Sequence, residues 1–288
     1  GGSYGGVGGT SDGTTNTVFG DYQQPLDFGI GGASTYGSTY YTRGGGTLKI
    51  IAGTFTHDGL ITANGANSNA SYPGGGGSGG AIWLDVGTLT GTGSISAKGG
   101  NKGTSGGGGG GGRIAIDYTD MSGFDVANIL NHGGTGSSNL SGAPGTTYLK
   151  SNVAITGDVY LDNASGPTDH VSTPITITTA EKLTVKNTNI LMGGTYGDVD
   201  LTGTNVTLAD NVTATNFQLK TNTVLTTPTA SLSTDAKLVL TADTLNIDAT
   251  SKINLDGKGL YPTSEVTRNS GGSYGGVGGT SDGTTNTV

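Results

Sequence analysis

The residue types that most often carry catalysis are scarce in this chain and lie far apart. The histidines are His57, His132 and His170, and none has the spacing of a helical HExxH metal site. The string G-x-S-x-G occurs three times, around Ser3, Ser78 and Ser105. A nucleophile elbow needs a strand before that string and a helix after it. Here each copy lies inside a glycine-rich run, so we expect none of the three to be a nucleophile.

Carboxylates are also dispersed. Many β-helical enzymes cleave polysaccharides with clustered acids on one face of the coil, and glycosidases need a closely spaced pair. The densest acidic groups here are Asp158, Asp162 and Asp169, and then Asp198 and Asp200. We interpret them as solubilising charge along strand edges. The sequence therefore predicts no catalytic residue, no cofactor-binding residue and no enzymatic activity.

Calcium is the more serious question about ligands. Asp12, Asp162 and Asp256 lie in turn-like segments rich in oxygen donors, and they are the weak candidates for a calcium site. A calcium ion takes six to eight oxygens, and the nonapeptide GGxGxDxUx of calcium-binding solenoids is not matched. Ordinary Asx-turns explain these residues as well. We predict no metal site, with calcium at these turns as the alternative.

Composition excludes several classes of protein. Glycine accounts for 58 of 288 residues, charged residues for 12%, and the formal net charge is −8. This acidity disfavours nucleic acid as a partner, because a phosphate backbone is held by a basic patch. The absence of cysteine excludes disulfides and thiolate metal sites. No apolar run is long enough to cross a bilayer, so we expect no transmembrane segment.

The first half contains an internal repeat. Short alternating segments such as GGGTLKIIAG and GGAIWLDVG each follow a glycine. The anchor glycines recur at spacings of 34, 32 and 33, and they are Gly46, Gly80, Gly112 and Gly145. A second short strand follows in the first two units, where Ile61 aligns with Ile95. We assign residues 1–145 to a glycine-rich β-solenoid built from these repeats.

The second half has a different texture. From about Thr146 glycine becomes rarer, and apolar and polar residues alternate with period 2, as in strands with one buried face. Leucines recur at spacings of 18, 19 and 17, and they are Leu201, Leu219, Leu238 and Leu255. We assign residues 146–260 to a threonine-rich β-solenoid in which each rung has the length of this leucine spacing.

These patterns predict an all-β fold, namely a parallel β-helix with glycine-rich excursions. No helical segment separates the strands, which disfavours a βαβ layout. A β-sandwich is the alternative, because closely spaced short strands also fit it. The run of seven glycines at residues 106–112 is either a loose surface loop or a place where successive excursions stack backbone to backbone. Recurrence favours stacking, with tyrosines lying over the glycines, namely Tyr4, Tyr36, Tyr40, Tyr41 and Tyr72.

The two ends of the chain carry the same sequence. Residues 271–288 repeat residues 1–18 without a change, at an offset of 270. The chain also starts on glycine, without a methionine or a signal peptide, so we expect a piece of a longer, repeating protein. Residues 261–288 then form the start of the next repeat. The predicted self-association residues are Gly1, Tyr4, Gly5, Gly271, Tyr274 and Gly275.

The stretch GGSGGAIWLDVGTLTGTGSISAKGGNKGTSGGGGGGGRIAI resembles glycine-rich parallel β-helix repeats of very large bacterial extracellular and cell-surface proteins. The resemblance covers residues 1–150 and 251–288 best. It implies an extracellular or cell-surface stalk, adhesin or fibre, and it carries no catalytic residues. We therefore expect a structural unit of an extracellular filament whose partner is its own neighbouring repeat, by continuous or head-to-tail stacking. With about twelve rungs, its axial repeat is on the order of 55–60 Å. An adhesin stalk or carbohydrate-binding module, with surface glycans as partners, is the alternative.

Overall fold

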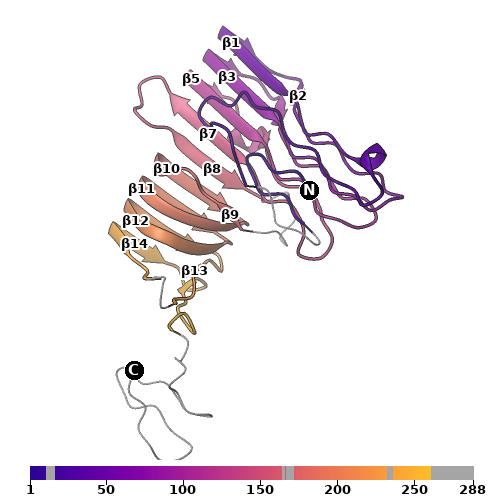
Figure 1. The fold of residues 1–288 in the computed structure, drawn as a ribbon. Helices are drawn as coiled ribbons and strands as arrows, with labels where there is room; N and C mark the ends of the chain where they lie inside the picture. Colours follow the sequence, from indigo (N-terminus) through magenta and orange to yellow (C-terminus); the bar gives the residue numbers. More distant parts are fainter. Residues whose placement is uncertain (11–16, 164–165, 167–171, 232–235, 261–288) are drawn as a thin grey trace, which may run out of the picture.

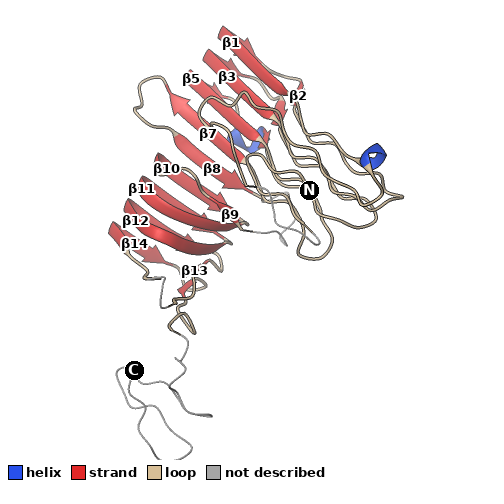
Figure 2. Ribbon diagram, in the orientation of Figure 1, coloured by secondary structure: helices blue, strands red, loops and turns tan. Residues whose placement is uncertain are grey.

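The computed structural model describes residues 1–260 except 11–16, 164–165, 167–171 and 232–235. Within these residues the fold is all-β, and its helical parts are two short 3-10 turns at Ser38–Tyr40 and Val126–Asn128 (Figure 2). A three-stranded sheet consists of β2 (Leu60–Thr62), β4 (Ser94–Ser96) and β6 (Ile129–Leu130). A much longer sheet of twelve strands forms the spine of the molecule (Figure 1).

The long sheet is built almost entirely from parallel pairs. Its main path runs β1–β3–β5–β7–β8–β10–β11–β12–β13–β15, while β14 pairs with β12 and β9 with β11. The strands are β1 (Thr47–Thr56), β3 (Ala81–Thr90), β5 (Arg113–Gly123), β7 (Thr146–Ser151), β8 (Asp158–Asp162), β9 (Thr173–Pro174), β10 (Thr179–Lys186), β11 (Asn189–Thr202), β12 (Asn205–Lys220), β13 (Val224–Thr226), β14 (Leu240–Ile247) and β15 (Lys252–Ile253). An all-β, mostly parallel architecture is thereby confirmed. Parallel pairing does not fit the antiparallel sheets of the sandwich alternative.

The register of the first four strands reproduces the spacing of the anchor glycines. Thr47 pairs with Ala81, Ala81 with Arg113, and Arg113 with Thr146. These three offsets equal those between successive anchor glycines, because each anchor glycine immediately precedes its strand. The short second strands also align as the sequence indicates, since Ile61 lies opposite Ile95. One period of the repeat therefore adds one level to the sheet.

The register of the second half corrects one sequence-based assignment. Leu201 pairs with Leu219 at the expected offset of 18, but the next residue in this column is Ile247, at an offset of 28. Leu238 is only partly buried and does not take that place. The prediction was wrong there because period-2 alternation fits many registers equally well. A long connection between β13 and β14 increases the offset between paired residues, while the period-2 alternation within each strand continues unchanged.

Chain direction reverses between β7 and β8, which form the one antiparallel pair among the described strands. The buried face changes at the same point. In the first half, Ile114 and Leu149 point into one core, while Trp83, Ala115 and Tyr148 lie on the opposite face. Val159 pairs with Tyr148 and shares that opposite face, which becomes the core of the second half. Two cores therefore lie on opposite sides of one continuous sheet.

The corners of the second half stack on one another. The register places Asn187 beside Gly203, and Gly203 beside Thr221, directly after paired strand ends. All three have positive φ, at 50°, 61° and 54°. Glycine and asparagine adopt this left-handed backbone at low cost, which suits them to a sharp corner. The repeated corner explains why the alternating strands turn at the same place in successive levels.

The glycine runs form a layer of their own beside β1–β7, which Figure 2 shows as bundled loop segments. Segments distant in sequence are joined there by backbone hydrogen bonds, for example from Gly76 N to Gly107 O and from Gly109 N to Gly100 O. Most of the glycines from residue 74 to residue 112 in this layer are buried. We call these segments the glycine layer: residues 1–9, 28–33, 43–45, 63–68, 74–80, 97–101, 106–112, 131–136 and 140–145. Backbone stacking of the excursions, rather than a loose loop, is confirmed.

Candidate functional site

The histidines and serines singled out in the sequence make structural contacts. The His57 ring is buried between Phe55 and Phe124, and its Nε2 lies 3.1 Å from Ser94 O. Oγ of Ser3 accepts from Gly8 N, and Oγ of Ser78 accepts from Ile30 N. Ser105 accepts from Gly74 N through its backbone carbonyl. His132 contacts Gly133 O, and His170 lies outside the described residues. None of these described side chains forms a nucleophile–base pair.

The calcium candidates are not brought together. Asp162 forms an ion pair with Lys186 at 3.5 Å, whereas Asp256 donates its backbone N–H to Asn254 Oδ1 in a local turn. Asp12 lies outside the described residues. Across the described part of the chain, no three His, Asp or Glu side chains are grouped closely enough to hold a metal ion. The structure thus gives Asp162 and Asp256 different local surroundings, in which ion pairing and turn formation account for their contacts.

Two acidic side chains share a surface hollow near the reversal. A hollow of about 610 Å³ is lined by Tyr118, Val153, Ile155, Asp158 and Glu181, among others. Burial, followed by the charge of Glu181, raises the pKa of Asp158 above its ordinary value. An acidic pair alone does not define a glycosidase site, which must also position a sugar between the two groups. The expectation of a non-enzymatic protein therefore stays a prediction.

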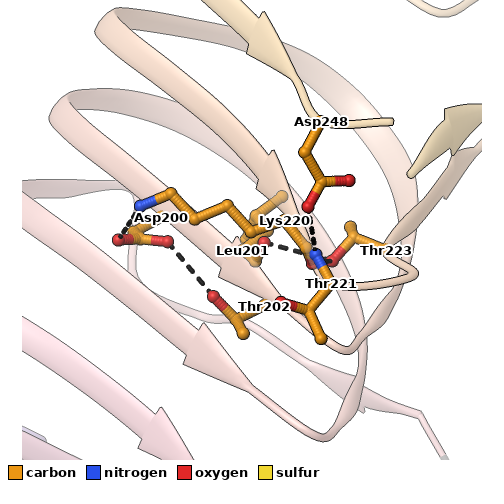
Figure 3. Close-up of polar contacts among 7 residues, drawn as sticks. All are labelled: Asp200, Leu201, Thr202, Lys220, Thr221, Thr223 and Asp248. Atoms are coloured by element: carbon orange, nitrogen blue, oxygen red, sulfur yellow. Dashed lines mark hydrogen bonds and ion pairs between the residues drawn. The ribbon is translucent and has the colours of Figure 1, made fainter. Parts of the chain in front are cut away.

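Other acids tie successive levels of the second half together (Figure 3). Lys220 Nζ lies 2.9 Å from Asp200 Oδ2, across the β11–β12 pair. Thr221 N donates to Asp248 Oδ2 at 2.6 Å, which links the corner after β12 to the turn after β14. The hydrogen bond from Thr221 N is the largest cause that holds the pKa of Asp248 well below its ordinary value, and donors of Ser251 and Thr250 lower this pKa further. These carboxylates stabilise turns between neighbouring levels.

Residues 1–9 occupy a slot in the middle of the glycine layer, where Figure 1 marks the N-terminus. The segment folds back on itself, since the Gly1 amino group contacts Gly9 O. Five backbone hydrogen bonds of 2.8–2.9 Å join it to other segments of the layer. Their donors and acceptors are Gly2 N to Gly76 O, Gly6 N to Gly111 O, Gly9 N to Gly108 O, Gly110 N to Gly2 O, and Ala143 N to Val7 O. We call this position the glycine slot.

One aromatic side chain anchors the segment in the slot. Tyr4 is completely buried, its ring centroid lies 5.0 Å from that of Phe19, and the Arg113 guanidinium carbon lies 5.5 Å from the Tyr4 ring. Arg113 is itself buried and donates to Phe19 O and Thr146 Oγ1. Burial raises the pKa of Tyr4 to about 12. A buried guanidinium over an aromatic face gains cation–π energy that partly offsets its desolvation.

The glycines of the segment are required by close backbone approach. A Cβ on Gly5 would overlap with the carbonyl oxygen of Gly112 and lie 2.7 Å from its carbonyl carbon. Gly1 has the same problem against Gly108. Three predicted self-association residues, Gly1, Tyr4 and Gly5, are therefore brought together in one slot. Their counterparts Gly271, Tyr274 and Gly275 lie outside the described residues.

Binding of the segment in the slot should depend on pH through the Gly1 amino group. Burial lowers the pKa of this group from 8.0 to about 6. The folded chain therefore binds fewer protons than the unfolded chain between pH 6 and 8, so stability rises across that window and is level above pH 8. We expect a gain of about 1–2 kcal/mol, because a tenfold change in proton affinity is worth about 1.4 kcal/mol and the group is partly exposed.

Chemical denaturation of the full chain at several pH values measures this gain. The control is the same chain with an acetylated N-terminus, which has no amine to desolvate. Burial also lowers the pKa of His132, and that contribution is common to both forms. Identical pH profiles for the free and acetylated chains would show that Gly1 is not buried in the slot.

Within the described residues, core side chains at both ends of the long sheet remain partly or largely exposed. In the column Val199–Phe217–Leu245, the first two side chains are 1% and 0% exposed, whereas Leu245 on β14 is 45% exposed. Ile247 ends the neighbouring column at 43%. At the other end, Ile50 on β1 continues the column of buried Leu84 and Ile116 but is only partly buried. No capping helix covers either end within the described residues.

Three tyrosines cluster at the margin of the glycine layer. The Tyr40 and Tyr72 ring centroids lie 4.3 Å apart, and Tyr36 packs against both rings while remaining 62% exposed. Tyr41 nearby is also exposed. The expectation that tyrosines cover the glycines thus holds for Tyr4, which is enclosed in the layer, while this cluster presents aromatic surface to solvent.

Sequence reasoning missed Arg113 as the partner of the slot. It follows the longest glycine run directly, and a lone arginine after seven glycines was the available signal. Neither of the described helical turns has the length or apolar run that crossing a membrane as a helix requires. Comparison with known protein families, with curated proteins and with solved structures found no match.

Proposed function

We propose that this chain is a structural repeat unit of an extracellular filament in which units stack end to end as a β-solenoid. The observation that carries the proposal is the pair of uncovered core columns at the two ends of the sheet. A soluble solenoid needs caps at its ends, because a terminal level otherwise exposes its core and its unpaired strand edge. Here a neighbouring unit takes the place of the cap.

A joint between β14 and β1 has a precedent inside the unit. The core of the first half and the core of the second half lie on opposite faces, so the sheet must change its buried face at the joint. The β7–β8 pair already makes such a change, with Tyr148 opposite Val159. On β1 the face that continues the second-half core carries Ile51, which is 70% exposed and available to contact Leu245. Covering the exposed part of each such side chain contributes about 1 kcal/mol.

The repeated end sequence supports a chain of units. Residues 271–288 have the same sequence as residues 1–18, of which residues 1–9 occupy the glycine slot. Tandem repeats in one long chain account for this identity most simply, and interlocking separate subunits are the other route. The resemblance to glycine-rich surface repeats supports an extracellular or cell-surface location.

Helical reconstruction of assemblies of the protein tests the proposal. Nine levels lie on the described path from β1 to β14, which at about 4.8 Å each span about 43 Å. We expect filaments with strands perpendicular to the axis and an axial repeat between about 43 and 60 Å per unit. Strands parallel to the axis, or a repeat far outside this range, would exclude end-to-end stacking of the sheet.

An adhesin stalk with a carbohydrate-binding surface is the second candidate. The exposed cluster of Tyr36, Tyr40 and Tyr72 favours it, because sugar rings stack on exposed aromatic faces. Binding of immobilised glycans that is lost in Y36A supports this role. Filament formation without glycan binding would leave the structural role alone.

A further inference from the structure

We propose that residues 271–279 of one copy bind in the glycine slot of another copy, which adds a second contact between units to the one between β14 and β1. The segment GGSYGGVGG is then a ligand for a surface built by the rest of the chain. This inference rests on the proposed filament function, because it assumes that units assemble and names the segment by which one unit recognises the next. The partner is a second copy of this chain, and its binding element is the repeated nine-residue segment.

The slot recognises features that both copies of the segment carry. Residues 1–9 are held by five backbone hydrogen bonds, by glycines that approach other backbones closely, and by one buried aromatic ring. Residues 271–279 have the same sequence. Tyr274 corresponds to Tyr4 and therefore offers the same ring to Arg113. Gly275 corresponds to Gly5 and offers the same bare Cα to Gly112.

The slot is formed by residues remote from the segment in sequence. The backbone partners of residues 1–9 in other segments lie between Gly76 and Ala143, except Phe19, whose N–H donates to Tyr4 O. Arg113 supplies the side chain that faces Tyr4. Val7 N also lies 3.4 Å from Thr173 Oγ1, in the second half of the chain. Most of the receptor is thus provided by parts of the fold that are remote from the segment in sequence, and Phe19 adds a backbone and a ring contact to Tyr4.

The exit from the slot suits a continuing chain. The Gly1 amino group is largely buried and its pKa is lowered because burial disfavours the charged form. An amide nitrogen at this position, which Gly271 has, carries no charge to desolvate. Gly1 as a residue is only partly buried. A segment without a free amino group therefore avoids this desolvation in the slot.

Residues 1–9 of a chain compete with residues 271–279 of another copy for the same slot, and the experiment must remove this competition. The resident segment is tethered, and its effective concentration is on the order of millimolar. A segment supplied in trans must displace it. Gly5→Val removes the resident segment from the slot, because the added Cβ overlaps with the Gly112 carbonyl. Gly275→Val makes the identical change in the other copy and leaves the resident segment intact.

The test uses the full chain and a labelled peptide, GGSYGGVGGTSDGTTNTV. We expect the peptide to bind the G5V chain at least about a hundredfold more tightly than it binds the unsubstituted chain, since the tethered competitor is gone. The control peptide with Gly5→Val should not bind. Mass photometry should show more assembly for G5V, less for G275V and none for the double variant.

Three outcomes would overturn the inference. They are no peptide binding to a folded G5V chain, equal binding of the control peptide, and equal assembly of the G5V and G275V chains. Should G5V fail to fold alone, restoration of its cooperative unfolding by the peptide supports the slot, and failure of the peptide to restore it counts against the slot. If G275V still forms filaments and the peptide does not bind, the proposed filament function stands and binding of residues 271–279 in the slot is refuted. If the peptide binds but no filaments form, slot binding stands and the proposed filament function is refuted.

Discussion

Gly109→Ala should unfold the first half of the protein or cost it more than about 4 kcal/mol, an effect outside the range of ordinary substitutions. A Cβ at residue 109 would overlap with Gly77 O and lie 3.0 Å from Ser78 N. Gly109 also donates to Gly100 O and accepts from Gly134 N, so the segment cannot shift without breaking bonds on both sides. Thermal unfolding followed by circular dichroism measures the loss.

Gly53→Ala is the matched control for this substitution. Gly53 lies in β1, and a Cβ there has no neighbouring atom within 4 Å. Alanine loses less backbone entropy than glycine on folding, so we expect no change or a gain of up to about 1 kcal/mol. A similar loss for both variants would mean that glycine is needed for flexibility rather than for close packing. A negligible loss for Gly109→Ala would refute backbone stacking in the glycine layer.

Leu245→Asp should weaken end-to-end association by more than about a hundredfold while leaving the isolated unit folded. Leu245 is nearly half exposed at the end of a core column, so an aspartate there remains hydrated in a single unit. In a stacked unit the same carboxylate is buried without a partner, which costs at least about 3 kcal/mol. Analytical ultracentrifugation across a concentration series, together with the unfolding midpoint of the single unit, measures both effects.

Asn246→Asp provides the control for charge. Asn246 is the next residue on β14, its side chain points to the other face of the sheet, and it is exposed. The same added charge should change association little there. A second reference is Phe217→Asp, one level deeper in the column of Leu245, which should unfold the unit because Phe217 is fully buried. If Leu245→Asp and Asn246→Asp weaken association equally, net charge rather than the end of the column controls it.

The sequence by itself determined the class of the fold and much of its period. Alternating Val, Ile, Leu and Thr without helix-length segments allowed only an all-β chain. The anchor glycines at Gly46, Gly80, Gly112 and Gly145 set the register of four strands correctly. These features are local, because strand propensity and turn residues act over a few neighbouring positions. The identity of residues 1–18 and 271–288 is likewise visible without any structure.

Tertiary structure alone decided where the chain reverses and what the N-terminal segment contacts. The antiparallel junction of β7 and β8, and the exchange of buried faces between Leu149 and Tyr148, depend on which side of the sheet the returning chain covers. An alternating sequence is compatible with burial of either face of the sheet, so no pattern in the sequence tells which face is buried. The offset from Leu219 to Ile247 was hidden for the same reason.

The contacts of the glycine slot were also visible only in the tertiary structure. The predicted self-association residues Gly1, Tyr4 and Gly5 proved to lie together, but most of the backbone partners of their segment are spread over residues 76–143. Arg113 is adjacent to Tyr4 only because the glycine layer folds over β5. Glycines indicate close packing without specifying a partner, since a residue with no side chain carries no complementary chemistry. Short-range composition thus determined that backbones would meet, and only long-range contacts decided which backbones they were.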